Sequence, residues 1–332
     1  MTALPPILIV MIVLSVIFDF LNGIHDSSNI VATMIASRAF SPRMALGITA
    51  IAHFVAPFIF GVAVATTIGH EVVSADAISM NVLIAALASA IVWNLLTWFL
   101  GIPSSSSHAL IGGMIGAVTI GAGASAIELD GMEKILIALF ISPIIGLALG
   151  YFFTKIVFFL ARGATPKINV FFKRSQIVSA IALSLSHGTN DAQKTMGIIT
   201  LGLVIAGVIP NFEVPLWVIT ISAGAIALGT AFGGWKLIKT LGSKFYKIRP
   251  VHGFSAQLTS AFVILGASIV GGPVSTTQVV SSAIMGVGSA DRVKMVRWGV
   301  AKDIIVAWIV TIPATAAIAA GLFLFFDRVL LL

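Results

Sequence analysis

The sequence predicts an all-α integral membrane protein composed of two inverted-topology repeats with broken helices. Three observations carry this prediction: the composition, the spacing of the apolar runs, and a pair of motifs that occurs twice. Of the 332 residues, 58% are hydrophobic and 9% are charged, whereas soluble domains contain about 45–50% and about 25% of these classes. The chain therefore belongs in lipid rather than in water.

Long apolar runs recur along the chain, and each is near the ~20 residues that a helix needs to cross a bilayer. In chain order, they include Ile7 to Leu21, Met44 to Ile68, Val82 to Leu100, Ile135 to Leu160 and Ile304 to Phe326. A transmembrane barrel would instead show short alternating strands. No basic residue precedes the first run, which continues into Asp19, so we expect it to be retained rather than cleaved as a signal peptide.

The basic residues are concentrated in four short connections. Sixteen of the nineteen Lys and Arg lie in or beside Arg38 to Arg43, Lys155 to Arg174, Lys236 to Arg249, and Arg292 to Lys302. The positive-inside rule assigns these connections to the cytoplasm. The acidic connections Gly69 to Asn81, Gly121 to Lys134, and Pro210 to Pro215 are then outside, together with both termini. This pattern accounts for the net charge of +7 without a nucleic-acid partner.

Two motifs occur twice in the same order. "NGIHDSSN" (Asn22 to Asn29) aligns with "HGTNDAQK" (His187 to Lys194), and "IPSSSSHALIGGMIG" (Ile102 to Gly116) aligns with "GPVSTTQVVSSAIMG" (Gly272 to Gly286). The matched glycines and acids are Gly23 with Gly188, Asp26 with Asp191, and Gly116 with Gly286.

The two motif spacings, 165 and 170 residues, divide the chain into two similar halves. We assign residues 1–161 to the first repeat, 162–175 to a basic cytoplasmic linker and 176–332 to the second repeat. The first half starts outside and the second inside, so the repeat is inverted. This arrangement is common among secondary transporters that alternate access around a central site.

Each half contains a proline followed by hydroxyl side chains, and we expect a new helix to start there. A helix start presents free N–H groups and the positive end of the dipole, which together with hydroxyl donors bind an anion. The two starts, related by the repeat, would face each other and enclose a tetrahedral oxyanion. The candidate ligands are Ser104, Ser105, Ser106, Ser107, Ser275, Thr276 and Thr277. Ordinary helix caps are the alternative interpretation.

Asp26 and Asp191 each lie in the middle of an apolar crossing. An ionised carboxylate at this depth costs at least ~2.5 kcal/mol, so it needs a partner or a proton. Carboxylate and amide oxygens are hard ligands for small cations, and we predict sodium, in preference to a proton, at both aspartates. The amides that could complete the cation sites are Asn22, Asn29 and Asn190. For Asp191, an ion pair with Lys194 is the alternative.

Three histidines, His25, His108 and His187, lie beside these motifs. The chain has no cysteine and no histidine pair at metal-ligand spacing within a segment, so a zinc site is disfavoured. We expect these histidines to be hydrogen-bonded core residues. Asp19 is a further ionisable residue in apolar surroundings and has no assigned role.

At these motifs the sequence resembles the inorganic phosphate transporter family, whose signature is a "GANDVANA"-like motif in each of two inverted halves. "GIHDSSNI" (Gly23 to Ile30) and "GTNDAQKT" (Gly188 to Thr195) match that signature. The proline and hydroxyl segments match the paired re-entrant hairpins of the family. In this chain, His25 replaces the first Asn of the motif in one half, and Lys194 replaces the second Asn in the other.

The resemblance implies a secondary active transporter that takes up inorganic phosphate by symport with a cation, with sodium preferred, through alternating access. It places the hydroxyls on phosphate and the aspartates near the coupling cations, and it implies no enzyme activity and no cofactor beyond those ions. A proton-coupled phosphate or sulfate permease and a passive anion channel are the alternatives. A hydrolase is disfavoured because the chain has no G-x-S-x-G elbow. We expect a multi-pass plasma-membrane protein, with a homodimer as the default assembly.

Overall fold

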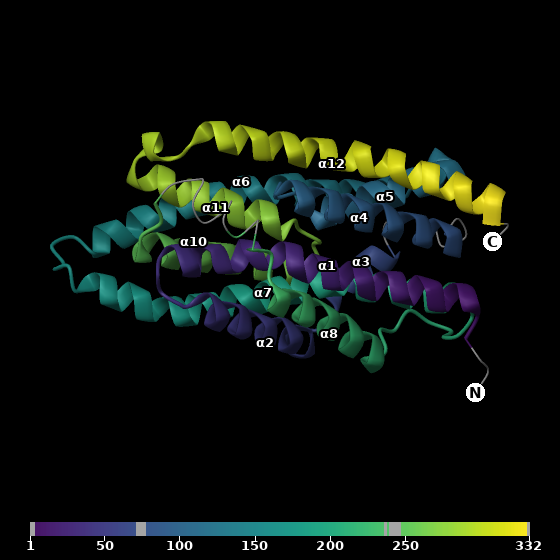
Figure 1. The fold of residues 1–332 in the computed structure, drawn as a ribbon, viewed down its shortest axis with the longest axis horizontal. Coiled ribbons are helices and arrows are strands. Elements are labelled where there is room, and N and C mark those ends of the chain that lie inside the picture. Colours follow the sequence, from purple (N-terminus) through teal and green to yellow (C-terminus); the bar gives the residue numbers. More distant parts are fainter. Residues whose placement is uncertain (1–3, 71–77, 236–237, 239–246, 331–332) are drawn as a thin grey trace.

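The computed structural model describes residues 4–70, 78–235, 238 and 247–330, and it is a bundle of long α-helices (Figure 1). The main helices are α1 (Pro6–Ala36), α2 (Pro42–Phe60), α3 (Ala63–His70), α4 (Met80–Leu100), α5 (Ser106–Gly121), α6 (Leu129–Leu160), α7 (Ile168–Ile205), α8 (Leu216–Phe232), α10 (Pro250–Ile269), α11 (Thr276–Asp291) and α12 (Trp298–Phe325). No strand occurs within the described ranges. The predicted all-α class is confirmed.

Five helices of the described chain, α1, α2, α4, α6 and α12, are long and apolar enough to cross a membrane. The surface composition agrees with a lipid environment. Large apolar side chains face outward, including Phe262 at 74% and Ile144 at 67% exposure, whereas many polar side chains of α1 and α7 are fully buried. In water, this much exposed apolar surface would favour aggregation. The chain is a multi-pass membrane protein.

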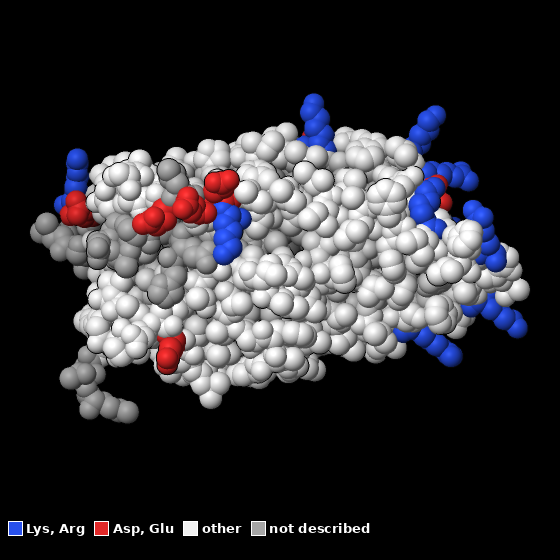
Figure 2. Space-filling model, turned by 180° about the vertical axis from the view of Figure 1, so that it is seen from behind, with Lys and Arg blue, Asp and Glu red and all other residues white. Residues whose placement is uncertain are grey.

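Charged residues separate toward the two ends of the bundle. Most of the visible Lys and Arg side chains gather at one end, and most of the Asp and Glu side chains lie toward the other (Figure 2). The α1–α2, α6–α7 and α11–α12 connections lie at one end of the bundle, opposite both ends of the chain (Figure 1). Most of the predicted cytoplasmic segment Lys236 to Arg249, and most of the predicted outer segment Gly69 to Asn81, lie outside the described residues.

The second apolar run, Met44 to Ile68, forms two helices rather than the single crossing helix that its length predicts. Helix α2 ends at Phe60, and Gly61 has a φ of +77° before α3 begins at Ala63. The break is stabilised by Gln193 of α7. Its Oε1 accepts hydrogen bonds from the backbone N–H groups of Val64 and Ala65 at 2.7 and 3.2 Å, and its Nε2 donates to the Gly61 carbonyl at 2.6 Å.

Helices from the two halves of the sequence pack against each other in pairs. Helix α5 packs on α12 and α11 on α6, while α1 packs on α8 and α2 on α7. Glycine permits the closest approaches: a Cβ on Gly116 would lie 2.0 Å from the Ala316 carbonyl oxygen, and one on Gly286 would lie 2.1 Å from that of Leu147. The matched glycines of the second motif thus occupy equivalent crossings.

Candidate functional site

The two predicted helix starts meet inside the bundle. Ser105 caps the N-terminus of α5, where its Oγ accepts from the His108 N–H at 3.1 Å, and Ser275 caps α11 by accepting from the Gln278 N–H at 3.4 Å. The Ser275 hydroxyl also donates to Ser105 Oγ at 2.7 Å. Both helix dipoles therefore direct their positive ends to one buried region.

A glycine ends the helix that precedes each start. Gly101 directly follows α4, and Gly271 lies two residues beyond the end of α10; their φ values are +70° and +75°, a conformation that favours glycine. Pro103 and Pro273 follow within the extended connections that lead to the caps. This local chemistry explains why each hydroxyl run begins a new helix in the protein interior.

Asp26 lies in α1 and is fully buried beneath both helix starts. Its Oδ1 accepts hydrogen bonds from Thr277 Oγ1 at 2.9 Å and from Asn29 Nδ2 at 3.0 Å, and it lies 3.2 Å from His25 Nδ1. Its Oδ2 accepts from Ser106 Oγ at 3.2 Å. One carboxylate therefore contacts hydroxyls from both α5 and α11.

Asp191 lies in α7 and is likewise fully buried. Its Oδ1 forms an ion pair with Lys194 Nζ at 2.5 Å, as the alternative interpretation of this residue predicts. Its Oδ2 accepts a hydrogen bond from Thr276 Oγ1 at 2.9 Å.

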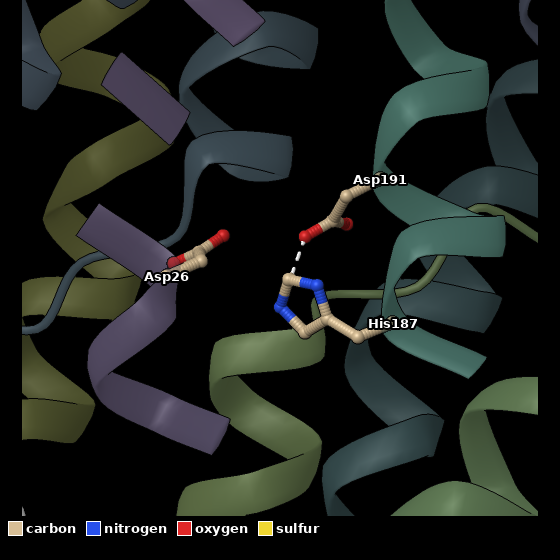
Figure 3. Close-up of side chains that lie close together, drawn as sticks. All are labelled: Asp26, His187 and Asp191. Carbon is tan, nitrogen blue, oxygen red and sulfur yellow. Dashed lines mark ion pairs between the residues drawn. The ribbon is translucent and has the colours of Figure 1, made fainter. Parts of the chain in front are cut away.

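Asp26, His187 and Asp191 form a compact cluster of possible cation ligands. One ligand atom from each lies within 4.8 Å of the others, and Figure 3 shows the three side chains pointing toward one another from α1 and α7. His187 Nε2 lies 3.2 Å from Asp191 Oδ2, yet neither ring nitrogen has a hydrogen-bond partner among the described residues. The expectation of a hydrogen-bonded core histidine is therefore not met at His187, whose ring instead stacks on that of His53.

The three predicted cation-site amides lie in the same interior and retain free oxygen atoms. Within the described part of the chain, Oδ1 of Asn22, Asn29 and Asn190 has no hydrogen-bond partner. The Asn190 amide is held in place because its Nδ2 donates to Ser268 Oγ at 2.9 Å and to the Gly272 carbonyl at 3.1 Å. Buried, unpaired amide oxygens of this kind are suitable ligands for a hard cation.

Most of the predicted anion ligands are brought together, and one lies apart. The hydroxyls of Ser106, Thr276 and Thr277 donate to the two aspartates, and that of Ser107 donates to the Val274 carbonyl at 3.2 Å. The Ser104 hydroxyl donates to Thr97 of α4 at 2.9 Å. Ser104 therefore faces α4, whereas the other hydroxyls line the meeting point of α5 and α11.

Two polar groups near this centre were not assigned roles in the sequence. Asp19 of α1 accepts a hydrogen bond from Thr195 of α7 at 2.5 Å, and its other carboxylate oxygen has no partner among the described residues. The Val274 carbonyl accepts from Lys194 Nζ at 3.0 Å. An ionisable residue within an apolar run is the signal that could have identified Asp19. The role of the Val274 carbonyl could not be predicted, because the sequence does not show which backbone carbonyl a side chain will contact.

Comparisons with known proteins agree with the family resemblance of the two motifs. The model of the phosphate transporter family matches residues 22–319. A Bacillus subtilis (strain 168) protein described as "Probable low-affinity inorganic phosphate transporter" is 46% identical over 316 residues, covering 94% of this chain and 95% of the relative. A Rhizobium meliloti (strain 1021) protein with the same description is 45% identical over 317 residues, covering 95% of each chain.

A solved structure is also similar along nearly the whole chain. It is described as "The sodium-dependent phosphate transporter" and matches with a TM-score of 0.91 at 25% sequence identity. The match covers 98% of this chain and 100% of that chain.

Proposed function

This chain belongs to the phosphate transporter family, and we propose that it takes up inorganic phosphate by symport with sodium through an alternating-access cycle. The observation that carries the proposal is the sharing of donors at the buried centre. The hydroxyls that a phosphate needs are the same hydroxyls that donate to Asp26 and Asp191. The anion ligands and the cation ligands thus form one network.

The proposed phosphate site lies where α5 and α11 begin. The N–H groups in the first turn of a helix have no intrahelical partner and point toward an anion. Ser105, Ser106, Ser107, Ser275, Thr276 and Thr277 surround these starts and supply hydroxyl donors. Several donors from two directions suit a tetrahedral oxyanion with four acceptor oxygens. Sulfate has the same shape, so its competition with phosphate must be measured.

The proposed sodium ligands are the carboxylates of Asp26 and Asp191, supported by the unpaired amide oxygens of Asn22, Asn29 and Asn190. Charge balance favours a cation here. Two ionised aspartates and one lysine leave a net negative charge at the centre, and a bound phosphate adds further negative charge. In a site shielded from water, this repulsion is strong unless a cation offsets it. The similarity to a structure described as a sodium-dependent phosphate transporter favours sodium as that cation.

Donor sharing gives a physical mechanism for coupling. A sodium ion on an aspartate supplies the positive charge that the O–H dipoles of Ser106 or Thr277 otherwise supply. Those hydroxyls are then free to donate to phosphate. Cation binding therefore raises phosphate affinity, and linkage requires phosphate to raise cation affinity by the same factor, typically about 5- to 150-fold.

Alternating access is supported by the duplicated motifs and the pairing of helices from the two halves. An inverted repeat lets the two halves exchange conformations, which opens one central site to either side in turn. The repeats would span residues 1–161 and 176–332, with re-entrant hairpins formed by α4–α5 and α10–α11. We place both termini outside because three basic connections lie at the opposite end of the bundle.

The test is equilibrium binding of phosphate to the purified protein, titrated with sodium at fixed pH. We expect sodium to increase phosphate affinity in the wild type, and Asp26→Asn to reduce this increase because it is nearly isosteric but neutral. Ser125→Ala, in a connection far from the centre, is the matched control. Equal sodium dependence in the wild type and Asp26→Asn would overturn the proposed cation site. If sulfate competes for the site as well as unlabelled phosphate does, the proposed substrates would include sulfate.

A further inference from the structure

The two halves place different residues at one equivalent position. Three residues after the motif aspartate, the first half has Asn29 and the second half has Lys194. Asn29 Nδ2 contacts Asp26 at 3.0 Å and Thr277 Oγ1 at 2.8 Å. Lys194 Nζ makes the corresponding contacts, with Asp191 at 2.5 Å and with Ser107 Oγ at 2.6 Å. Thr277 and Ser107 are themselves matched in the repeat, so an ammonium replaces an amide in otherwise equivalent surroundings.

The contacts around Lys194 Nζ suit an ammonium group. Its Nζ also donates to the Val274 carbonyl at 3.0 Å, which gives it three oxygen acceptors. A carboxylate and a carbonyl can only accept. The Ser107 hydroxyl gives its own proton to Val274 O, so its oxygen accepts from the lysine. Three acceptors match the three N–H donors of an ammonium group.

The oxygen set around Nζ has the chemistry of a cation site. A carboxylate, a hydroxyl and a backbone carbonyl, all buried, are the ligand types that hold hard cations in proteins. Building on the proposed sodium symport, we propose that Lys194 is a built-in cation that takes the place of a separate sodium ion at Asp191, which narrows the proposed sodium site to the Asp26 side of the cluster. Two equivalent halves would provide two exchangeable cations for each phosphate. This chain then couples phosphate to one fewer.

The first half retains the exchangeable site. Asn29 is neutral, and its Oδ1 has no partner within the described chain, so it can ligate an ion beside Asp26. His25 contacts Asp26 Oδ1 at 3.2 Å and can do so as a neutral donor. His187, whose ring nitrogens have no hydrogen-bond partner among the described residues, lies 3.2 Å from Asp191 Oδ2 and belongs to the same cluster as Asp26. Asp26 therefore depends on a mobile cation, whereas Asp191 has a tethered one.

The experiment measures the number of sodium ions transported per phosphate, using radiolabelled sodium and phosphate in proteoliposomes. Lys194→Asn gives the second half the residue of the first half and removes the built-in charge. The expected result is a gain of one sodium per phosphate, with the Hill coefficient for sodium rising from about one to about two. Lys194→Met, which removes the charge without adding an oxygen ligand, should weaken transport without this gain.

The control is the double variant Asn29→Lys with Lys194→Asn, which moves the built-in charge to the first half and should restore the wild-type ratio. A ratio in Lys194→Asn equal to that of the wild type would overturn the inference. If that variant does not transport, the sodium dependence of its melting temperature gives a readout that requires only binding, and an unchanged dependence would also overturn the inference. The wild-type ratio tests the proposed function separately, because a value of zero contradicts sodium symport whatever the variant gains.

Discussion

Ser106, Thr276 and Thr277 each donate a hydrogen bond from the hydroxyl group to a buried carboxylate. These three side chains link the two aspartates to the two helix starts, so a change in one hydroxyl affects both ligands of the proposed symport. The hydroxyl pair Ser105 and Ser275 instead joins α5 to α11 directly. At this scale, the side chains divide into those that connect the proposed ion sites and those that hold the two helices together.

Replacing Thr276 by Ala should weaken phosphate binding about tenfold or more, because losing a hydrogen bond to a charged ligand costs roughly 1.5–3 kcal/mol. Ser106→Ala should have a similar effect. Isothermal titration or filter binding with radiolabelled phosphate measures the change. Thr276→Ser keeps the hydroxyl and should retain most of the affinity, while Thr119→Val at the exposed end of α5 is the control. Unchanged affinity in both alanine variants would remove these hydroxyls from the phosphate site.

The polar residues of the centre could be selected from the sequence because the repeated motifs contain them. Asp26, Asp191 and the hydroxyl runs stand out as polar groups in apolar segments, and they meet in the structure. The hydrogen bond between Asp19 and Thr195 could not be predicted, because it depends on how α1 packs against α7. The position of Ser104 could not be predicted either, since its hydroxyl faces Thr97 only after α4 turns into the following helix.

The helices themselves follow the apolar pattern closely. The runs beginning at Ile7, Val82 and Ile135 lie within α1, α4 and α6, and the run beginning at Ile304 lies within α12 except for its last residue. Pro103 and Pro273 precede α5 and α11. The break between α2 and α3 was not predicted. It depends on the side chain of Gln193 from a distant helix, which satisfies the backbone groups that the break exposes.

The two close helix crossings predict a similar loss of stability when either of the matched glycines is replaced. Gly116→Ala and Gly286→Ala should each destabilise the protein by about 1–3 kcal/mol, because the added methyl group would overlap the backbone of α12 or α6. Melting temperatures of the purified variants in detergent measure this effect. Gly224→Ala is the control, since a Cβ at that position in α8 meets nothing within 4 Å. Wild-type melting temperatures for both crossing variants would contradict the packing described for these helices.

The whole molecule combines a lipid-facing apolar surface with a polar interior and an asymmetric distribution of charge. Composition alone predicts the apolar surface, and the repeated motifs locate the polar interior. The orientation of the halves depends on the positive-inside rule, which acts on connections during insertion rather than on contacts in the folded chain. The orientation of the whole chain in the membrane is therefore a prediction that a labelling measurement in cells can test.

Orientation can be measured directly because the chain has no cysteine. Ser125→Cys, in the connection between α5 and α6, should react with a membrane-impermeant maleimide added to intact cells. Ala164→Cys, in the basic connection between α6 and α7, should react only after the membrane is permeabilised. The unmodified chain is the control for background labelling. The reverse pattern would place both termini in the cytoplasm and invert the proposed topology.

The central claim, phosphate uptake driven by sodium, is tested most directly by radiolabelled phosphate uptake into proteoliposomes with one imposed ion gradient at a time. With an inward sodium gradient and equal pH on both sides, we predict phosphate accumulation above its external concentration, abolished when the sodium gradient is collapsed. An inward proton gradient without sodium should give no accumulation. Accumulation driven by the proton gradient alone, with no response to sodium, would contradict the account.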